Sequence, residues 1–196
     1  SIYKRGIKCG YVSTTLLAQV DASIGGKTGI NLAGYKNAVG TFSMPEFTYI
    51  NTELLKSLPE REYKAGLAEL YKTLALRDRE MFLGGEDILK MIERSVEIKN
   101  EVVKEDPTEK GLRKILNFGH TFGHAIERCA SNKVLHGEAV AAGMAIAVRL
   151  SNRLGYLSKD EMELFINKLC ALGFEVEAHY SPKDIMEAIK NDKKRV

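Results

Sequence analysis

The sequence has 196 residues, of which 44% are hydrophobic and 28% are charged, a balance typical of a globular chain and not of a disordered one. Lys and Arg number 29 against 26 Asp and Glu, and a net charge of +3 is too small to indicate a nucleic-acid or membrane-surface partner. The longest apolar stretch, residues 139–148, is about half a membrane span. We therefore expect neither nucleic acid nor membrane as a partner.

The three cysteines, Cys9, Cys129 and Cys170, are few and far apart. They form neither a disulfide framework nor a CxxC metal motif, which is typical of a reducing, cytoplasmic setting. The sequence begins at Ser1, inside what reads as structured sequence, with neither an initiator Met nor a signal peptide. We therefore expect the natural protein to be longer.

Residues 1–57 are predicted to form short strands joined by turns and one short helix. Seven of the 17 glycines lie in the first 40 positions, and β-branched and aromatic residues predict strands at 9–13 and 47–50. Two strands do not form a stable sheet alone, so we expect this region to belong to a larger sheet. Two Gly-rich segments, 24–31 and 34–40, are predicted to be turns.

From residue 57 onward the pattern is helical. Residues 57–60, Ser-Leu-Pro-Glu, combine a capping box with Pro in the first turn, which is typical of a helix start. Apolar residues at helical spacing extend this helix to about residue 77. Further helices are predicted at 86–104, 116–130, 137–153, 159–172 and 182–191. The fold is therefore expected to be mainly α.

Three of the four histidines, His120, His124 and His136, lie close together in the sequence. His120 and His124 are four residues apart on a predicted helix, and hence on one face, where they can share a metal. Gly119 and Gly123 have the same spacing beside them, although each Gly costs a helix roughly 1 kcal/mol relative to Ala. A tight helix crossing with packed histidines is the alternative, but the third histidine favours a metal site.

An open, zinc-type site also uses a carboxylate, and Glu69 is the candidate. Between residues 66 and 76 the polar side chains are Glu69, Lys72 and Thr73, so this helix is apolar almost all round. Its narrow polar stripe indicates a specific partner. The alternative is a solvent-facing Glu69–Lys72 pair, worth roughly 0.2–0.5 kcal/mol.

Two lysines occupy unusual positions. Lys99 lies near the middle of the apolar face of the predicted 86–104 helix, where a lysine either extends to water or pairs with an anion. Lys27 lies in a segment that resembles a Walker A loop, but Asp21 stands where the first Gly of that motif would be. That segment can still present Lys27 and backbone N–H groups to an anion. With Arg113, these residues suit a small anionic substrate in a metal site at a domain junction.

Six motifs occur in a fixed order along essentially the whole chain: residues 14–31, 36–37, 58–62, 66–69, 116–127 and 135–140. Each is only moderately specific, but together, in this order and spacing, they resemble the 3-dehydroquinate synthase family. The resemblance implies a multihelical C-terminal domain preceded by a few strands of a Rossmann-like α/β domain.

The resemblance also implies a function. Such enzymes are cytoplasmic homodimers of the shikimate pathway, which leads to chorismate and the aromatic amino acids. They convert 3-deoxy-D-arabino-heptulosonate 7-phosphate into 3-dehydroquinate and phosphate, using NAD and a divalent metal, usually zinc, with cobalt as another possibility. The reaction proceeds by oxidation, phosphate elimination, reduction, ring opening and an intramolecular aldol closure.

The metal ligands implied by the resemblance are Glu69, His120 and His136. His124 then becomes a proton-transfer residue beside the metal, which replaces the pairing of His120 with His124 suggested by their spacing. Three protein ligands leave coordination positions for substrate oxygens.

The resemblance further implies contacts to substrate and NAD. The substrate's carboxylate, hydroxyls and phosphate would contact Lys27, Asn37, Lys72, Lys99, Arg113, Asn117 and, across the dimer, Arg5. The NAD contacts would be Thr14, Thr15, Asp21, Lys27, Lys36 and Ser57, the last standing where the family usually has Thr. Asp21 would also meet a substrate hydroxyl, and Glu109 matches a proton acceptor of some members. A further family lysine corresponds to Lys193 or Lys194.

One departure concerns length, because the family's chains are nearly twice as long. Their N-terminal Rossmann-like half, with its Gly-rich pyrophosphate loop, has no counterpart in this sequence. We therefore expect residues 1–57 to be the end of an NAD-binding α/β domain and residues 58–196 to be an all-α metal- and substrate-binding domain. Alone, the chain is expected to be inactive.

Two other functions stay open. Related sugar-phosphate cyclases, of the 2-deoxy-scyllo-inosose and valiolone types, share the fold, NAD and the metal but differ at substrate contacts. The many cations, Lys99 and Arg113 among them, favour a substrate that carries a carboxylate. A non-catalytic helical domain, whose histidines only pack, is the second alternative.

Overall fold

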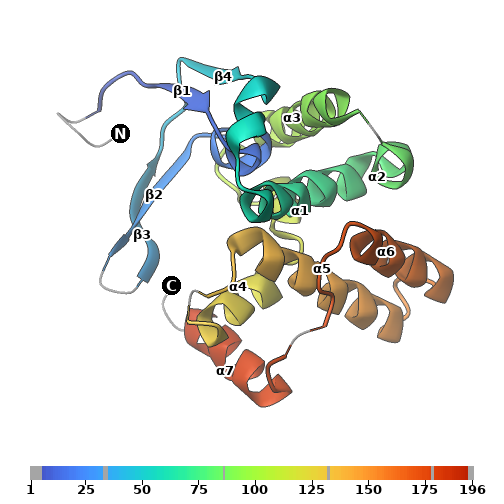
Figure 1. Cartoon of the computed structure of the whole chain (residues 1–196). Coiled ribbons are helices and arrows are strands. Elements are labelled where there is room, and N and C mark those ends of the chain that lie inside the picture. The colour runs from blue at the N-terminus through green and yellow to red at the C-terminus, as the bar shows by residue number, and fades with distance from the viewer. Residues whose placement is uncertain (1–5, 33–34, 86, 132, 178, 194–196) are drawn as a thin grey trace. The chain divides into compact units, whose positions relative to one another are not determined.

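The computed structural model describes residues 6–32, 35–85, 87–131, 133–177 and 179–193, with backbone only at 31–32, 35–38 and 191–193. The chain divides into two compact units, Ser1–Lys114 and Ile115–Val196. Helices predominate among the described residues, as predicted, and the described strands belong to the first unit (Figure 1). Within these ranges no helix has the length and hydropathy of a membrane span.

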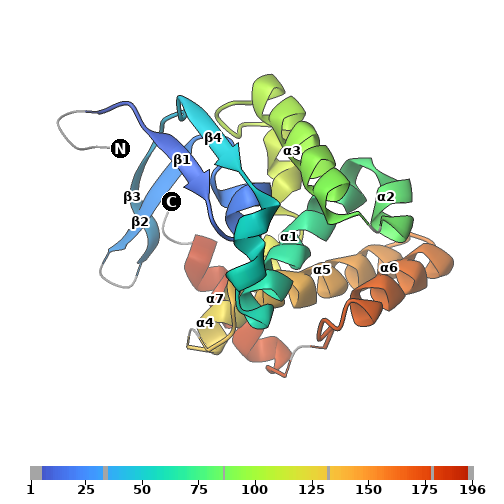
Figure 2. The same cartoon turned by 45° about the horizontal axis from the view of Figure 1, so that its top comes forward.

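The first unit contains a parallel strand pair, β1 (Gly10–Ser13) and β4 (Phe47–Ile50). Both strands were predicted, and Figure 2 shows them side by side. A parallel pair requires a crossover connection, and this one carries the predicted short helix, a π-helical turn η2 (Ala18–Ala22), followed by a hairpin.

The hairpin corrects the prediction of two Gly-rich turns. Its strands β2 (Lys27–Leu32) and β3 (Tyr35–Phe42) pair antiparallel, with Gly29 opposite Gly40. A Cβ at Gly40 would lie 1.9 Å from the carbonyl oxygen of Thr28, so glycine here permits close strand approach and does not mark a turn. Next to the hairpin, positive φ angles occur at Gly25 and Gly26, just before β2.

Helices build the rest of the first unit: η3 (Thr52–Ser57), α1 (Glu60–Arg77), α2 (Arg79–Gly84) and α3 (Ile88–Glu105). The sequence predicted α1 and α3 to within two residues but missed α2. Asp78 caps α2 by accepting from the Met81 N–H at 3.0 Å. Helix α1 packs on α3 and both contact η2, burying apolar side chains such as Leu16, Leu70 and Ile98.

The second unit is helical: α4 (His120–Cys129), α5 (His136–Arg153), α6 (Lys159–Ala171) and α7 (Pro182–Lys193). The predicted 116–130 helix is corrected, because residues up to Asn117 belong to a 3₁₀-helix, η4 (Leu112–Asn117). Gly119 then has φ 80° and α4 begins at His120. Helix α4 packs against α5 and α7, around a core that includes Ile126 and Ile185.

Candidate functional site

Two charged side chains of α1 are buried in the first unit. Glu69 and Lys72 form an ion pair with exposed side-chain fractions of 0% and 1%. The i,i+3 pairing was foreseen, but the solvent-facing interpretation was wrong, because both side chains are buried in a helix that packs against α2, α3 and η2. A buried ion pair stabilises little by itself, so its position in the interior points to a functional role.

Lys99 from α3 meets Asp21 from η2 within the same unit. The Lys99 ammonium donates to the Asp21 backbone carbonyl oxygen at 2.6 Å and forms an ion pair with its carboxylate. Lys99 is only 6% exposed, so it does not extend to water. The anion that satisfies it comes from the chain itself.

The electrostatics of Asp21, Glu69, Lys72 and Lys99 are linked. Burial opposes the charge of Lys72, but attraction to Glu69 and Asp21 outweighs it and raises the pKa of Lys72. Burial likewise opposes ionisation of Asp21, but Lys99 outweighs it and lowers the pKa of Asp21. For Lys99 burial dominates and lowers its pKa despite Asp21, with repulsion from Lys72 adding to the effect. These four residues, which we call the charge quartet, balance two cations against two anions.

Arg113 is held by the loop that follows α3. The Asp106 carboxylate accepts backbone N–H groups of Lys110, Gly111 and Arg113 at 3.0, 2.7 and 3.0 Å, and these hydrogen bonds lower the pKa of Asp106. Arg113 is 2% exposed. Its Nη1 and Nη2 donate to backbone carbonyls of Pro107 and Gly25 at 2.8 and 2.7 Å.

The third guanidinium nitrogen of Arg113, Nε, is buried without a hydrogen-bond partner among the described residues. A buried, unsatisfied cationic donor is costly, and an anionic ligand would satisfy it. On the same loop Glu109 has φ 59° and forms an ion pair with Lys27 of β2. The structure thus brings Lys27, Glu109 and Arg113 to one loop region.

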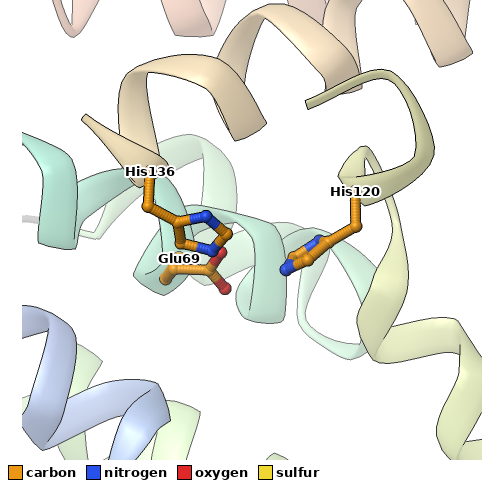
Figure 3. Close-up of side chains that lie close together, drawn as sticks. All are labelled: Glu69, His120 and His136. Atoms are coloured by element: carbon orange, nitrogen blue, oxygen red, sulfur yellow. The ribbon is translucent and has the colours of Figure 1, made fainter. Parts of the chain in front are cut away.

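In the second unit the three predicted histidines form a cluster. The ring centroid of His120 lies 5.4 Å from that of His124 and 5.3 Å from that of His136. The ring centroids of His124 and His136 lie 6.0 Å apart. Figure 3 shows the rings of His120 and His136 directed toward one another from the first turns of α4 and α5, and it also labels Glu69 on α1.

Each metal-candidate imidazole has an oxygen beside its Nδ1. His120 Nδ1 lies 3.2 Å from the Phe118 carbonyl oxygen, and His136 Nδ1 lies 3.3 Å from Glu127 Oε1. One nitrogen each of His124 and His136 and one carboxylate oxygen of Glu127 lie within 4.8 Å of one another. The second unit therefore contains imidazole and carboxylate donors of the type that zinc and cobalt accept.

Other predicted site residues lie at the ends of elements. Thr14 follows β1 and is exposed, while Thr15 Oγ1 accepts from the Ala18 N–H at 3.1 Å. Ser57 and Asn117 are exposed at the last positions of η3 and η4.

Several predictions fall outside what the structure describes. Arg5 and Lys194 are outside the described residues, and Lys36, Asn37 and Lys193 are described by backbone alone. Two residues near the site were missed by sequence reasoning, Asp106 and Glu127. Glu127 has a readable signal, because it follows His124 by three positions and His120 by seven and so shares their helix face.

Comparisons with known proteins cover residues 1–195. Residues 1–65 match the family model described as 3-dehydroquinate synthase N-terminal, and residues 66–195 match that described as 3-dehydroquinate synthase C-terminal. The two models meet at residues 65 and 66, whereas the compact units meet at 114 and 115. The domain boundary predicted between 57 and 58 stays a prediction.

Curated relatives include the 3-dehydroquinate synthases of Dictyoglomus turgidum and Campylobacter concisus. Each is 45% identical over 99% of this chain, and the matches cover 58% and 59% of their own lengths. The chain thus spans well under two thirds of the relatives it matches.

Solved structures of related cyclases share the fold. A 2-deoxy-scyllo-inosose synthase complexed with carbaglucose-6-phosphate, NAD⁺ and Co²⁺ has a TM-score of 0.89 and 30% identity over 99% of this chain and 57% of that one. A 2-epi-5-epi-valiolone synthase from Streptomyces hygroscopicus, with NAD⁺ and Zn²⁺ bound, has a TM-score of 0.86 and 28% identity over 99% of this chain and 58% of that one. With both family models matched in chain order, this chain belongs to the 3-dehydroquinate synthase family.

Proposed function

We propose that this chain provides the metal- and substrate-binding part of a 3-dehydroquinate synthase, which converts 3-deoxy-D-arabino-heptulosonate 7-phosphate into 3-dehydroquinate and phosphate. The observation that carries the proposal is the cluster of His120, His124 and His136, with ring centroids 5.3–6.0 Å apart, in a chain of this family. Lys72 and Lys99 of the charge quartet, with Arg113, are the cations proposed to bind an anionic sugar phosphate.

The proposed metal ligands are Glu69, His120 and His136. Glu69 lies in the middle of α1, and the two histidines open α4 and α5. One carboxylate with two imidazoles suits zinc, and cobalt is the alternative. The Nδ1 partners of both histidines support this set, because they place the ring lone pairs on Nε2. When bound, a divalent metal supplies Lewis-acid chemistry that acidifies a hydroxyl and polarises a carbonyl.

NAD is the proposed redox cofactor, with contacts from Thr14, Thr15, Asp21, Lys27, Lys36 and Ser57. Thr14 and Thr15 follow the carboxyl end of β1, the edge at which open α/β sheets bind ligands. NAD would supply the redox chemistry, as acceptor and later donor of the hydride on the substrate carbon that bears the oxidised hydroxyl.

The chain's own residues bind the substrate and move protons. The buried cations Lys72, Lys99 and Arg113 orient the substrate's anionic groups, together with the exposed Asn117. Lys27, Asn37 and Arg5 extend this binding surface. His124 transfers a proton beside the metal, and Glu109 is a second proton acceptor.

The proposal includes the setting of the enzyme. The proposed setting is a cytoplasmic homodimer of the shikimate pathway, and the three scattered cysteines support its cytoplasmic part. Arg5 would reach the substrate phosphate bound by the other subunit.

A substrate comparison tests the reaction. The protein that carries this chain, supplied with NAD and zinc, is expected to release phosphate from the heptulosonate phosphate and not from sedoheptulose 7-phosphate or glucose 6-phosphate, which lack the carboxylate. Preference for either of the other sugars would assign the chain to a related cyclase instead. If purified protein holds no metal, or if Glu69→Ala and His136→Ala leave its zinc content unchanged, the non-catalytic alternative stands.

A further inference from the structure

Glu127 and His136 form a contact for which the family motifs suggest no role. Glu127 lies one turn beyond His124 on α4, and His136 opens α5. Glu127 Oε1 is 3.3 Å from His136 Nδ1, and the two side chains are 11% and 28% exposed. A carboxylate this deep in the second unit, beside a histidine cluster, is a candidate for tuning one of those histidines.

The chemistry of the two groups fixes the position of a proton. An ionised carboxylate only accepts hydrogen bonds, so His136 Nδ1 must be the donor, and the lone pair of the neutral ring then lies on Nε2. His120 is arranged in the same way, because its Nδ1 lies 3.2 Å from the Phe118 carbonyl oxygen, which also only accepts. Both imidazoles therefore share one tautomer.

We propose that Glu127 is a positioning residue that holds His136 as the Nδ1–H tautomer and so directs the Nε2 lone pair to the metal. This inference rests on the proposed metal site. The carboxylate fixes the ring orientation and increases the basicity of the imidazole, which strengthens it as a ligand. His120 is held in the same tautomer by a backbone carbonyl, which no substitution removes. The control of the tautomer can therefore be tested only at Glu127.

The test measures the tautomer and the metal affinity separately. In the 196-residue chain labelled with ¹⁵N-histidine and freed of metal, long-range ¹H–¹⁵N correlation at pH 8 should show His136 protonated on Nδ1. Glu127→Ala is expected to shift the ring toward Nε2–H and to weaken zinc binding, measured by chelator competition, by about 10–100-fold.

Two further variants sharpen the comparison. Glu127→Gln can accept through its oxygen or donate through its amide, so it tolerates both tautomers, and a half-populated competent tautomer weakens zinc binding by about twofold. Glu175→Ala is the matched control, because Glu175 pairs with His179 on the surface of the same unit. It removes the same charge and should leave zinc affinity unchanged.

The outcomes are decisive in both directions. An unchanged His136 tautomer with unchanged zinc affinity in Glu127→Ala overturns the proposal. If the Ala variant does not fold, the same result in Glu127→Met, whose side chain is of similar length and carries no carboxylate, overturns it equally. A zinc-induced shift of His124 nitrogens in place of those of His120 also overturns it, because Glu127 would then be a ligand. If the unaltered chain binds no zinc, the proposed metal site fails, and the metal-free tautomer alone decides the role of Glu127.

Discussion

Lys99 depends on Asp21 for its charge in the interior of the first unit. Lys99→Met leaves the Asp21 carboxylate without the ammonium that offsets its burial, so its pKa should rise. We expect the free energy of unfolding at pH 7 to fall by about 1–3 kcal/mol, less than for a fully buried pair, because the Asp21 side chain is 27% exposed. Urea denaturation measures this.

The control for Lys99→Met is Lys56→Met, which breaks an exposed ion pair with Glu53. It should lower the free energy of unfolding by no more than about 1 kcal/mol. The double variant Asp21→Asn/Lys99→Met should recover part of the loss. Equal losses for Lys56→Met and Lys99→Met would contradict the importance of the buried pair. In the enzyme assay Lys99→Met should also raise KM for the anionic substrate.

His120 and His124 separate binding from proton transfer, although both lie on one face of α4. If Glu69, His120 and His136 are the ligands, His120→Ala should abolish metal binding, whereas His124→Ala should keep the metal and lose about 10²–10⁴-fold in rate. Metal analysis after dialysis, together with kcat, checks this. Equal metal loss in both variants would restore the spacing-based pairing of His120 with His124.

For single residues, the sequence predicted where a side chain lies better than which group it contacts. The pairing of His120 with His124 was foreseen because helical spacing fixes which side chains share a face, whereas His136 was added by its nearness in the sequence and by the family motifs. The buried position of Lys99 was foreseen from the same periodicity. Its partner Asp21 was not, because the contact spans 78 positions in the sequence and depends on how η2 packs on α3.

The loop between α3 and η4 depends on Asp106. Asp106→Asn weakens three backbone hydrogen bonds, so it should lower stability at pH 7 and loosen Arg113. Because the folded-state pKa of Asp106 lies below 3.8, the carboxylate stabilises the fold above that pH, and this contribution is lost as the pH falls through the lowered value.

Urea midpoints measured from pH 7 down to pH 2 check this prediction. The difference in urea midpoint between the original chain and Asp106→Asn should become smaller as the pH falls. A gap that stays constant with pH would mean that the Asp106 charge contributes nothing to the loop.

The crossing of α4 and α5 depends on glycine. A Cβ at Gly143 would lie 2.1 Å from the Gly119 carbonyl oxygen and 2.7 Å from the Gly123 amide nitrogen. Both are backbone atoms, so Gly143→Ala must push the helices apart, at a cost of about 1–3 kcal/mol or more. It should also weaken metal binding, because His120 and His136 start these two helices.

The control is Gly84→Ala in α2, where a Cβ would meet nothing within 4 Å. It should leave stability unchanged or raise it by up to about 1 kcal/mol. Thermal unfolding of both variants checks the pair. Equal changes in thermal stability for Gly84→Ala and Gly143→Ala would show that close helix approach does not explain the glycine at position 143.

Elements with a strong local signal were predicted and the hairpin was not. Helix α1 starts at Glu60 as predicted, but the predicted capping box does not form, because Pro59 is the N-cap without a side-chain hydrogen bond and Ser57 ends η3. The strands β1 and β4 follow from β-branched residues. Residues 24–31 and 34–40 were read as turns because glycine usually marks them. In β2 and β3 glycine instead allows two backbones to approach, a tertiary effect that no local pattern reveals.

At the scale of the whole chain the two compact units carry different chemistry. The first unit holds the charge quartet and Arg113, and the second holds the three clustered histidines. The curated relatives pair these same segments in one chain, of which this sequence covers 58% in the first case. The proposed ligand set takes Glu69 from the first unit and both histidines from the second.

Zinc should therefore link the unfolding of the two units. At a concentration 100-fold above its Kd it should add about 2.7 kcal/mol to the free energy of unfolding, and calorimetry should show that both units gain. Glu69→Gln lowers stability even without zinc, because it leaves the buried Lys72 ammonium without its carboxylate. The informative quantity is thus the zinc-dependent increment, measured against chelator. It should be lost from the first unit in Glu69→Gln and kept in Glu53→Gln, which alters an exposed side chain. An increment of equal size in both variants would remove Glu69 from the ligand set.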